Sequence, residues 1–383
     1  MEQATQHSAA RLARLQAFME QDPQNFSLLT DAFDCALALG EFKTAQQYLE
    51  RALGIEPRNV FLRHSQATLW IAEKRYAEAE SLLSELIAEG VNSAVVAFNL
   101  AYAQFRQHKY DQARDLLRSL PGAPDAPPDS FAMLLRCLHH LRAFDEAFAL
   151  IEARLREKTL DVAAAGVASL MYLDANRLGE AKSLSEAALQ SNPNHIEALV
   201  TRGSVALGER DVATARSLLA RALAQNAQDG RVWSASAMTH LLEMNLDQAL
   251  SEFKTAVSFM PNHIGTWHGM AWCNLMKKDL AAAQQNFEAA MALDRNFGET
   301  HGGLAVALAL QGRREEAKLS IERALRLDPQ SLSARYAEAV LSGEVADQEA
   351  FQRLARRVLG ARAHAGGTLA DLIPGLNRDS DRH

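Results

Sequence analysis

The strongest constraint in the sequence is an alanine that recurs every 34 residues. It occurs nine times without a gap, as Ala45, Ala79, Ala113, Ala147, Ala181, Ala215, Ala249, Ala283 and Ala317. A fixed period of this length indicates a repeat architecture, in which each unit buries its apolar face only by stacking on its neighbours. We number this alanine as repeat position 20, so that the first repeat begins at Phe26 and the ninth ends at Ser331.

Other positions of the repeat predict a pair of helices joined by a turn. Position 8 is small in seven repeats: Ala67, Ala101, Ser169, Gly203, Ala237, Ala271 and Ala305. Positions 4, 7, 8 and 11 share one helical face, and positions 20, 24, 27 and 28 share another. Proline occupies position 32 in four repeats, as Pro57, Pro193, Pro261 and Pro329. Because proline cannot continue a helix interior, position 32 marks the break before the next repeat.

Length and composition agree with an all-α array. At 383 residues the chain exceeds an ordinary single core, so several domains or a repeat array are expected. Apolar residues make up 48% and charged residues 23%, and neither fraction indicates disorder. Alanine and leucine dominate and proline is rare, which favours helix.

This pattern resembles the tetratricopeptide repeat family, over about four-fifths of the chain. The resemblance implies an all-α fold, a right-handed superhelical solenoid of antiparallel helix pairs. It also implies a concave surface lined by the first helix of each pair. Members of the family usually serve as scaffolds or adaptors that bind a peptide or a helix of a partner.

The sequence divides the chain into four predicted segments. They are a capping helix in residues 1–25, nine repeats in 26–331, two capping helices in 332–360, and an irregular or disordered tail in 361–383. Four prolines and a glycine within residues 121–128 interrupt the third repeat without changing the period. Two interpretations stay open here, a shortened helix with an extended connector and a flexible joint.

In such an array, positions 2, 5, 9 and 12 face the concave groove, and here they are more apolar than charged. The third repeat presents an aromatic ladder, and the predicted partner-binding groove comprises Phe61, Phe98, Tyr102, Phe105, Arg136, Met238, Leu241, His268, Trp272 and Leu275. Unburied apolar patches usually mark interaction surfaces, and rigid aromatic anchors often dominate binding. We therefore expect the groove to bind an amphipathic helix or an extended apolar peptide. The alternative is that the aromatic side chains pack between neighbouring first helices.

Four glycines fall inside predicted first helices near the end of the array: Gly265, Gly269, Gly302 and Gly303. Each costs roughly 1 kcal/mol relative to alanine within a helix, so each needs a reason. One interpretation is close packing of helices. The other is a second binding site, formed with the aromatic residues around Trp272.

The sequence carries no recognisable catalytic chemistry. It has no glycine-rich phosphate loop, no metalloprotease helix and no nucleophile elbow. Cys137, His139 and His140 are spaced so that they occupy different helix faces, which argues against a metal site. We therefore predict a protein that is not an enzyme, with no catalytic residue, no cofactor and no metal.

The net charge and the cysteine spacing limit which kinds of partner and which cellular compartment are expected. The net charge is −7, and the strongest basic cluster, at Arg353, Arg356, Arg357 and Arg362, is typical of a solvated helix face, so nucleic acid is not expected. Three distant cysteines fit a reducing compartment. With no hydrophobic signal core and no run of 18 apolar residues, the sequence predicts a cytoplasmic protein that does not insert into membranes.

Three functional hypotheses remain. The first is a scaffold or adaptor, the second a dedicated chaperone for an apolar segment of a secreted or membrane client, and the third a regulatory subunit of an enzyme. The partner is a protein or peptide in all three. A monomer and a tail-mediated dimer both stay open, and the apolar tail residues Leu369, Leu372, Ile373 and Leu376 could instead occupy the groove as an autoinhibitor.

Overall fold

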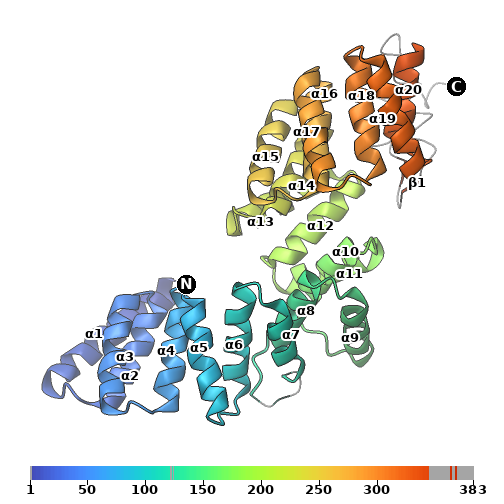
Figure 1. Ribbon diagram of the computed structural model, residues 1–383. Helices are drawn as coiled ribbons and strands as arrows, with labels where there is room; N and C mark the ends of the chain where they lie inside the picture. The colour runs from blue at the N-terminus through green and yellow to red at the C-terminus, as the bar shows by residue number, and fades with distance from the viewer. Residues whose placement is uncertain (1, 121–122, 124, 345–362, 365–366, 369–383) are drawn as a thin grey trace. The chain divides into compact units, whose positions relative to one another are not determined.

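The computed structural model describes residues 2–120, 123, 125–344, 363–364 and 367–368. The chain divides into two compact units, Met1–Val167 and Ala168–His383, which we call the N-terminal and C-terminal units. In the described part, helices form adjacent antiparallel pairs throughout both units (Figure 1), which confirms the all-α repeat array. The predicted basic cluster, the closing helix near residues 348–359 and the apolar tail residues lie outside the described residues.

The helices follow the 34-residue period. The N-terminal unit contains α1 (Glu2–Gln21), α2 (Phe26–Ala38), α3 (Phe42–Ile55), α4 (Val60–Ala72), α5 (Tyr76–Ala88), α6 (Ala94–Arg106), α7 (Tyr110–Arg118), α8 (Ser130–His140) and α9 (Phe144–Glu157). Helix α10 (Val162–Asp174) contains the boundary. The C-terminal unit continues with α11 (Leu178–Ser191), α12 (Ile196–Gly208), α13 (Val212–Gln225), α14 (Gly230–Leu242), α15 (Leu246–Phe259), α16 (Ile264–Met276), α17 (Leu280–Leu293), α18 (Gly298–Leu310), α19 (Arg314–Leu327) and α20 (Leu332–Ser342). Strands β1 (Ala363–His364) and β2 (Gly367–Thr368) pair antiparallel.

The recurring alanine lies where the two helices of each repeat meet. All nine position-20 alanines have an exposed fraction of 0%. A larger side chain there would separate the helices, because protein interiors are packed without spare volume. The 34-residue period of the sequence is therefore the interval at which the paired helices come into close contact.

The turn inside every repeat uses a left-handed residue at position 15. The residues are Gly40, Lys74, His108, Arg142, Asn176, Arg210, Met244, Lys278 and Gly312, all with φ between 56° and 77°. In the first repeat, the N–H of Gly40 donates to the carbonyl of Leu37, and that of Glu41 donates to the carbonyl of Ala36. This pairing satisfies the last carbonyls of the first helix and reverses the chain. Only two of the nine residues are glycine, so the sequence pattern did not reveal this cap.

The first helix of the next repeat donates a hydrogen bond to the break between repeats. Trp233 Nε1 donates to the Ala227 carbonyl at 2.8 Å, and Trp267 Nε1 donates to the Pro261 carbonyl at 2.8 Å. In both pairs position 4 reaches back to position 32 of the preceding repeat. A carbonyl left free by the helix break thus gains a partner, and the entry angle of the next helix is set.

The irregular stretch at residues 121–128 follows the shortest of the described α-helices, α7, which has 9 residues. Asp125 on the connector accepts hydrogen bonds from the N–H of Ala94 at 3.0 Å and the hydroxyl of Ser93 at 3.3 Å. A carboxylate at the N-terminus of α6 is favourable because unpaired N–H groups and the helix dipole concentrate there. The flexible joint proposed for this stretch stays a prediction, which hydrogen exchange across residues 110–140 would test.

Candidate functional site

The surface of interest is the first-helix face of the N-terminal unit, formed by α4, α6 and α8. At position 2 of adjacent repeats, Phe61 on α4 is 53% exposed and Val95 on α6 is 36% exposed. Phe98, Tyr102 and Phe105 follow on α6 and are half-buried. Their spacing of three to four residues places them on one side of the helix. We call Phe61, Val95, Phe98, Tyr102 and Phe105 the aromatic face.

Tyr102 and Phe105 of the aromatic face contact neighbouring rings. Tyr102 meets Tyr76 edge to face, with ring centroids 6.4 Å apart. Phe105 meets Tyr110 at 5.3 Å and His140 at 5.4 Å, and Tyr110 stacks on His140 at 4.3 Å. These contacts fix the rings without burying them fully. The packing alternative thus accounts for part of the Tyr102 and Phe105 rings, and both side chains keep an exposed part.

Arg106 adds a fixed cation to the aromatic face. Its guanidinium lies 4.9 Å from the ring centroid of Tyr76 and 5.9 Å from that of Tyr102, and Nη1 donates to the Tyr102 hydroxyl at 3.0 Å. The side chain is exposed. Arg106 was not among the predicted groove residues, because it occupies position 13 and only positions 2, 5, 9 and 12 were considered. Its place directly after Phe105 was the available signal.

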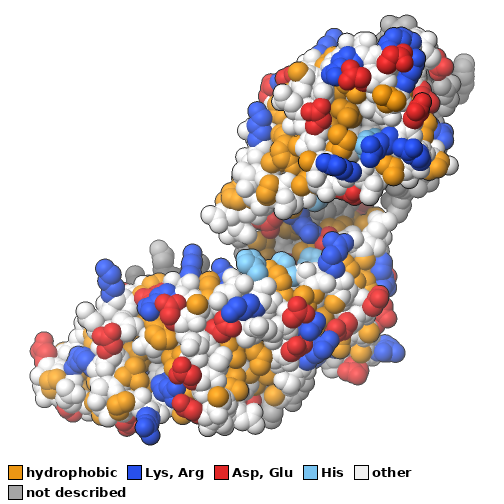
Figure 2. All heavy atoms as spheres, in the orientation of Figure 1, with side chains coloured by type: hydrophobic (Ala, Val, Ile, Leu, Met, Phe, Trp, Pro, Cys, Tyr) orange, Lys and Arg blue, Asp and Glu red, His pale blue; other side chains and the backbone are white. Residues whose placement is uncertain are grey.

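Polar residues border the aromatic face on both sides. On α4, Nε2 of His64 accepts a hydrogen bond from the Asn99 amide at 2.9 Å, and burial lowers the pKa of His64, which favours this neutral acceptor form. On α8, Arg136 is half-buried at position 9, the position that Tyr102 holds one repeat earlier. Helix α8 ends in His139 and His140. Figure 2 shows several histidine side chains gathered on one part of the surface.

The predicted groove residues of the C-terminal unit mainly join neighbouring helices. Met238 and Leu241 pack against a buried cluster around Phe253. Nε2 of His268 lies 2.8 Å from the Thr300 hydroxyl, and burial lowers the pKa of His268 to about 4. Trp272 meets Phe287 edge to face at 6.0 Å. Leu275 is 9% exposed and belongs to the core.

Two of the four helical glycines make room for aromatic rings. A Cβ on Gly269 would lie 2.4 Å from Cζ of Phe253, and a Cβ on Gly303 would lie 2.3 Å from Cε1 of Phe287. In both pairs a phenylalanine at position 24 faces position 6 of the next repeat. Gly302 faces Ser331, Ser333 and Ala334, where α20 approaches α18 closely. Close packing therefore accounts for three glycines, and the second binding site stays a prediction.

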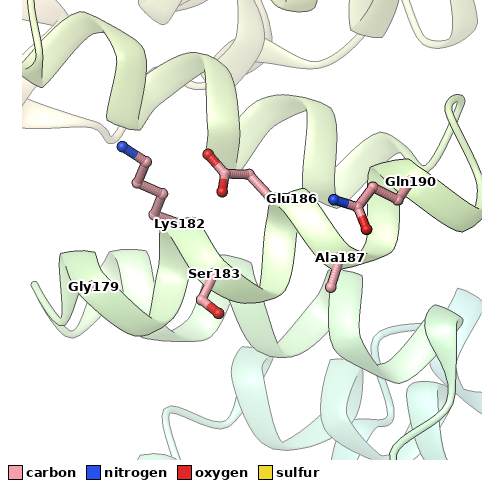
Figure 3. Close-up of a pocket in the computed structure, with 6 residues that line it drawn as sticks. All are labelled: Gly179, Lys182, Ser183, Glu186, Ala187 and Gln190. Carbon is pink, nitrogen blue, oxygen red and sulfur yellow. The ribbon is translucent and has the colours of Figure 1, made fainter.

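An open hollow on α11 does not form a ligand site. It is lined by one face of this helix, from Gly179 to Gln190 (Figure 3). Its two charged side chains are already engaged, since Lys182 pairs with Glu209 at 2.6 Å and Glu186 with Arg202 at 2.9 Å. Among the described residues, only α11 lines the hollow.

Reactive chemistry is not evident in the described part of the chain. Burial raises the pKa of Cys137 to about 12 and that of Cys273 to about 11, so both thiols stay protonated and are poor nucleophiles. Within the described residues, no group of three or more His, Cys, Asp or Glu could hold a metal ion. None of the described helices is long and apolar enough to cross a membrane.

Comparison with protein families decides the relationship. One tetratricopeptide repeat model matches residues 71–129, 172–239 and 274–341, and a second matches residues 34–59. The chain belongs to the tetratricopeptide repeat family. Curated protein sequences gave no match.

One solved structure shares the fold at low identity, and others align with part of the chain. A monomeric mutant of IFIT1 with m7Gppp-AAAA is 13% identical, has a TM-score of 0.52, and aligns over 88% of this chain and 83% of its own. YrrB, described as having an unusual peptide-binding site, is 19% identical, has a TM-score of 0.38, and aligns over 50% of this chain and 97% of its own. PilF of Pseudomonas aeruginosa is 18% identical, has a TM-score of 0.42, and aligns over 52% and 93%.

Proposed function

We propose that this tetratricopeptide repeat protein is an interaction scaffold that binds a partner's amphipathic helix or extended apolar peptide on the aromatic face. One observation carries the proposal: large apolar side chains on successive first helices are only partly covered within the described structure. Within the aromatic face, Phe61 and Val95 are the most exposed. The rings beside them are held in place by Tyr76, Tyr110 and His140.

The energetics favour a protein ligand on such a surface. Burying a phenylalanine fully contributes about 1.5–3 kcal/mol, so covering the exposed half of Phe61 contributes roughly 1 kcal/mol. Rings that are already fixed lose little side-chain entropy when a partner binds. A preformed aromatic surface of this kind is suited to the alternate apolar side chains of a helix or an extended peptide.

The test is photo-cross-linking through this surface. A benzophenone amino acid would replace Phe61 in the full chain, and the same residue at Leu319 would serve as the control, because Leu319 on α19 is 66% exposed and far from the aromatic face in sequence. We expect Phe61 adducts to contain a defined apolar segment that Leu319 adducts lack. Identical adducts at both positions would contradict the proposal.

Charge variants then separate the functional hypotheses. Phe98→Glu/Tyr102→Glu should lose partners of the aromatic face while keeping the helical circular-dichroism signal. Phe61→Glu changes a more exposed residue of the same face, so loss of the same partners in this variant would not be due to misfolding. Loss of a single client segment would favour a chaperone. Retention of folded partners alongside one lost segment would favour the adaptor. A stoichiometric complex with one enzyme would favour a regulatory subunit.

A further inference from the structure

We infer that the segment bound by the aromatic face is acidic as well as apolar, with its carboxylates placed over the ends of α6 and α8. This inference rests on the proposed function and specifies the chemistry of the partner. It comes from the distribution of charge over the first helices, from the position of Arg106 and from the repeat positions on either side of it.

Acidic residues are absent from the three helices that form the surface. Helices α4, α6 and α8 contain no Asp or Glu, although the chain as a whole has 47 acidic and 40 basic residues. Acids lie on the second helices, such as Glu80 on α5 and Glu146 on α9, and at the N-termini of α6 and α8, as Asp125 and Asp129. Toward the C-terminal ends of α6 and α8 the first-helix face is therefore locally basic in an acidic protein.

The basic character is concentrated at one end. Along position 9 of the first four repeats the residues are Asp34, Thr68, Tyr102 and Arg136, so the charge changes from negative to positive across the unit. Position 13 adds Arg106, and α8 ends in two histidines. Phe105 and Tyr102 lie within this basic end. A ligand that follows the rings toward α8 therefore meets increasing positive potential.

Arg106 differs from Arg63 on α4 in its partners. Arg63 pairs with Glu85 on α5 and with Glu89, the residue that follows α5. Arg106 has only aromatic and hydroxyl partners, and no carboxylate of the described residues lies within ion-pair distance of it. Two rings and one hydrogen bond already orient its guanidinium. A pre-oriented guanidinium with unused N–H donors is suited to bidentate binding of a carboxylate.

A peptide carboxylate fits this surface better than a nucleic-acid phosphate. A nucleic-acid backbone needs a basic track, whereas here Asp31 and Asp34 on α2 lie at the other end of the same series of first helices. The exposed Phe61 and Val95 between these ends match apolar side chains. We therefore assign the face to a segment with apolar anchors followed by Asp or Glu.

A random 16-residue peptide library displayed on phage, selected on the full chain, tests the inference. We expect the selected peptides to combine apolar residues with Asp or Glu. In fluorescence anisotropy at low salt, Arg106→Glu should weaken the best acidic peptide about tenfold, because a charged rim contact becomes a repulsive one. Lys43→Glu is the matched control, since Lys43 on α3 is exposed, makes no ion pair within the described residues, and gives the same change of charge.

The outcomes separate this inference from the proposed function. Peptides that bind through Phe61 and Phe98 but show no acidic preference, or no sensitivity to Arg106→Glu, would overturn the inference and leave the aromatic face as a binding site. Peptides unaffected by Phe61→Glu and Phe98→Glu would overturn the proposed function itself. A labelled oligoadenylate that binds more tightly than the selected peptides, and competes with them, would reassign the face to nucleic acid.

Discussion

Gly303 offers a direct test of how the repeats of the C-terminal unit are spaced. A Cβ at this position would lie 2.3, 2.5 and 2.9 Å from Cε1, Cζ and Cδ1 of Phe287, whereas carbon atoms in contact prefer about 3.5–4.0 Å. Phe287 is fully buried and meets the rings of His268 and Trp272 on α16. The ring therefore has no free space to move into, and Gly303→Ala requires α18 to move away from α17.

Two opposing contributions set the magnitude. Replacing glycine by alanine inside a helix gains about 1 kcal/mol. Overpacking a close-packed core costs about 1–3 kcal/mol, and a clash of more than 1 Å with a fixed ring belongs at the upper end. We therefore expect Gly303→Ala to lower the free energy of unfolding by about 1–2 kcal/mol. Gly54→Ala on α3 is the control, because nothing lies within 4 Å of its added Cβ, and it should be neutral or stabilising.

The assay is urea unfolding followed by circular dichroism, together with hydrogen exchange of peptides from α17 and α18. The destabilisation should appear as faster exchange in these helices, and it should shrink in the double variant Gly303→Ala/Phe287→Leu, where the smaller side chain leaves room for the methyl group. If Gly303→Ala were as stable as the Gly54→Ala control, or if the double variant showed no coupling, the ring would not determine the spacing.

Three further predictions concern the turn, a buried histidine and the thiols. Met244→Gly should raise the free energy of unfolding in urea by about 0.5–1 kcal/mol, because Met244 is exposed at a left-handed φ of 61° that glycine adopts without strain. Gly312→Ala, at φ 77°, should lower it by a similar amount. If both variants were as stable as the wild type, the turn would not be strained. Because burial lowers the pKa of His268 from 6.5 to about 4, protonation favours the unfolded chain, so the free energy of unfolding should fall by about 2–3 kcal/mol between pH 6.5 and pH 4 through this group. His268→Gln should remove that part of the fall, and an unchanged pH profile would refute it. Cys137 and Cys273 should react with a thiol reagent at pH 8 only after urea is added, since burial keeps both pKa values near or above 11; fast labelling of the folded protein would contradict their burial.

The helical repeat could be predicted from the sequence because its determinants recur. The alanine at position 20 appears nine times, and each copy meets the same requirement, a close approach of two helices. The left-handed turn at position 15 could not be predicted in the same way. There the backbone conformation recurs, but seven non-glycine residues of five types adopt it, so no single residue type marks it.

The candidate site was predictable only in part, for a related reason. Phe61 and Phe98 could be assigned to a first-helix face from the period alone, but the degree of exposure depends on neighbours from other repeats. Leu275 occupies position 12 exactly as Phe105 does, yet it is buried in the core while Phe105 is half-buried. The difference comes from the packing of adjacent repeats, and the sequence of one repeat does not contain it.

Positions 20 and 9 of the repeat differ in how much the residue type varies along the chain. Position 20 is alanine in every repeat, and each copy is fully buried where two helices meet. Position 9 is Asp34, Tyr102 and Arg136 in the first, third and fourth repeats, and none of these side chains is buried. Asp34 is exposed, where substitutions usually change stability by less than about 0.5 kcal/mol, so folding does not require its charge. We propose that the change of charge along the first-helix face reflects what the face binds, which is the reason for placing the acidic end of the partner at Arg106.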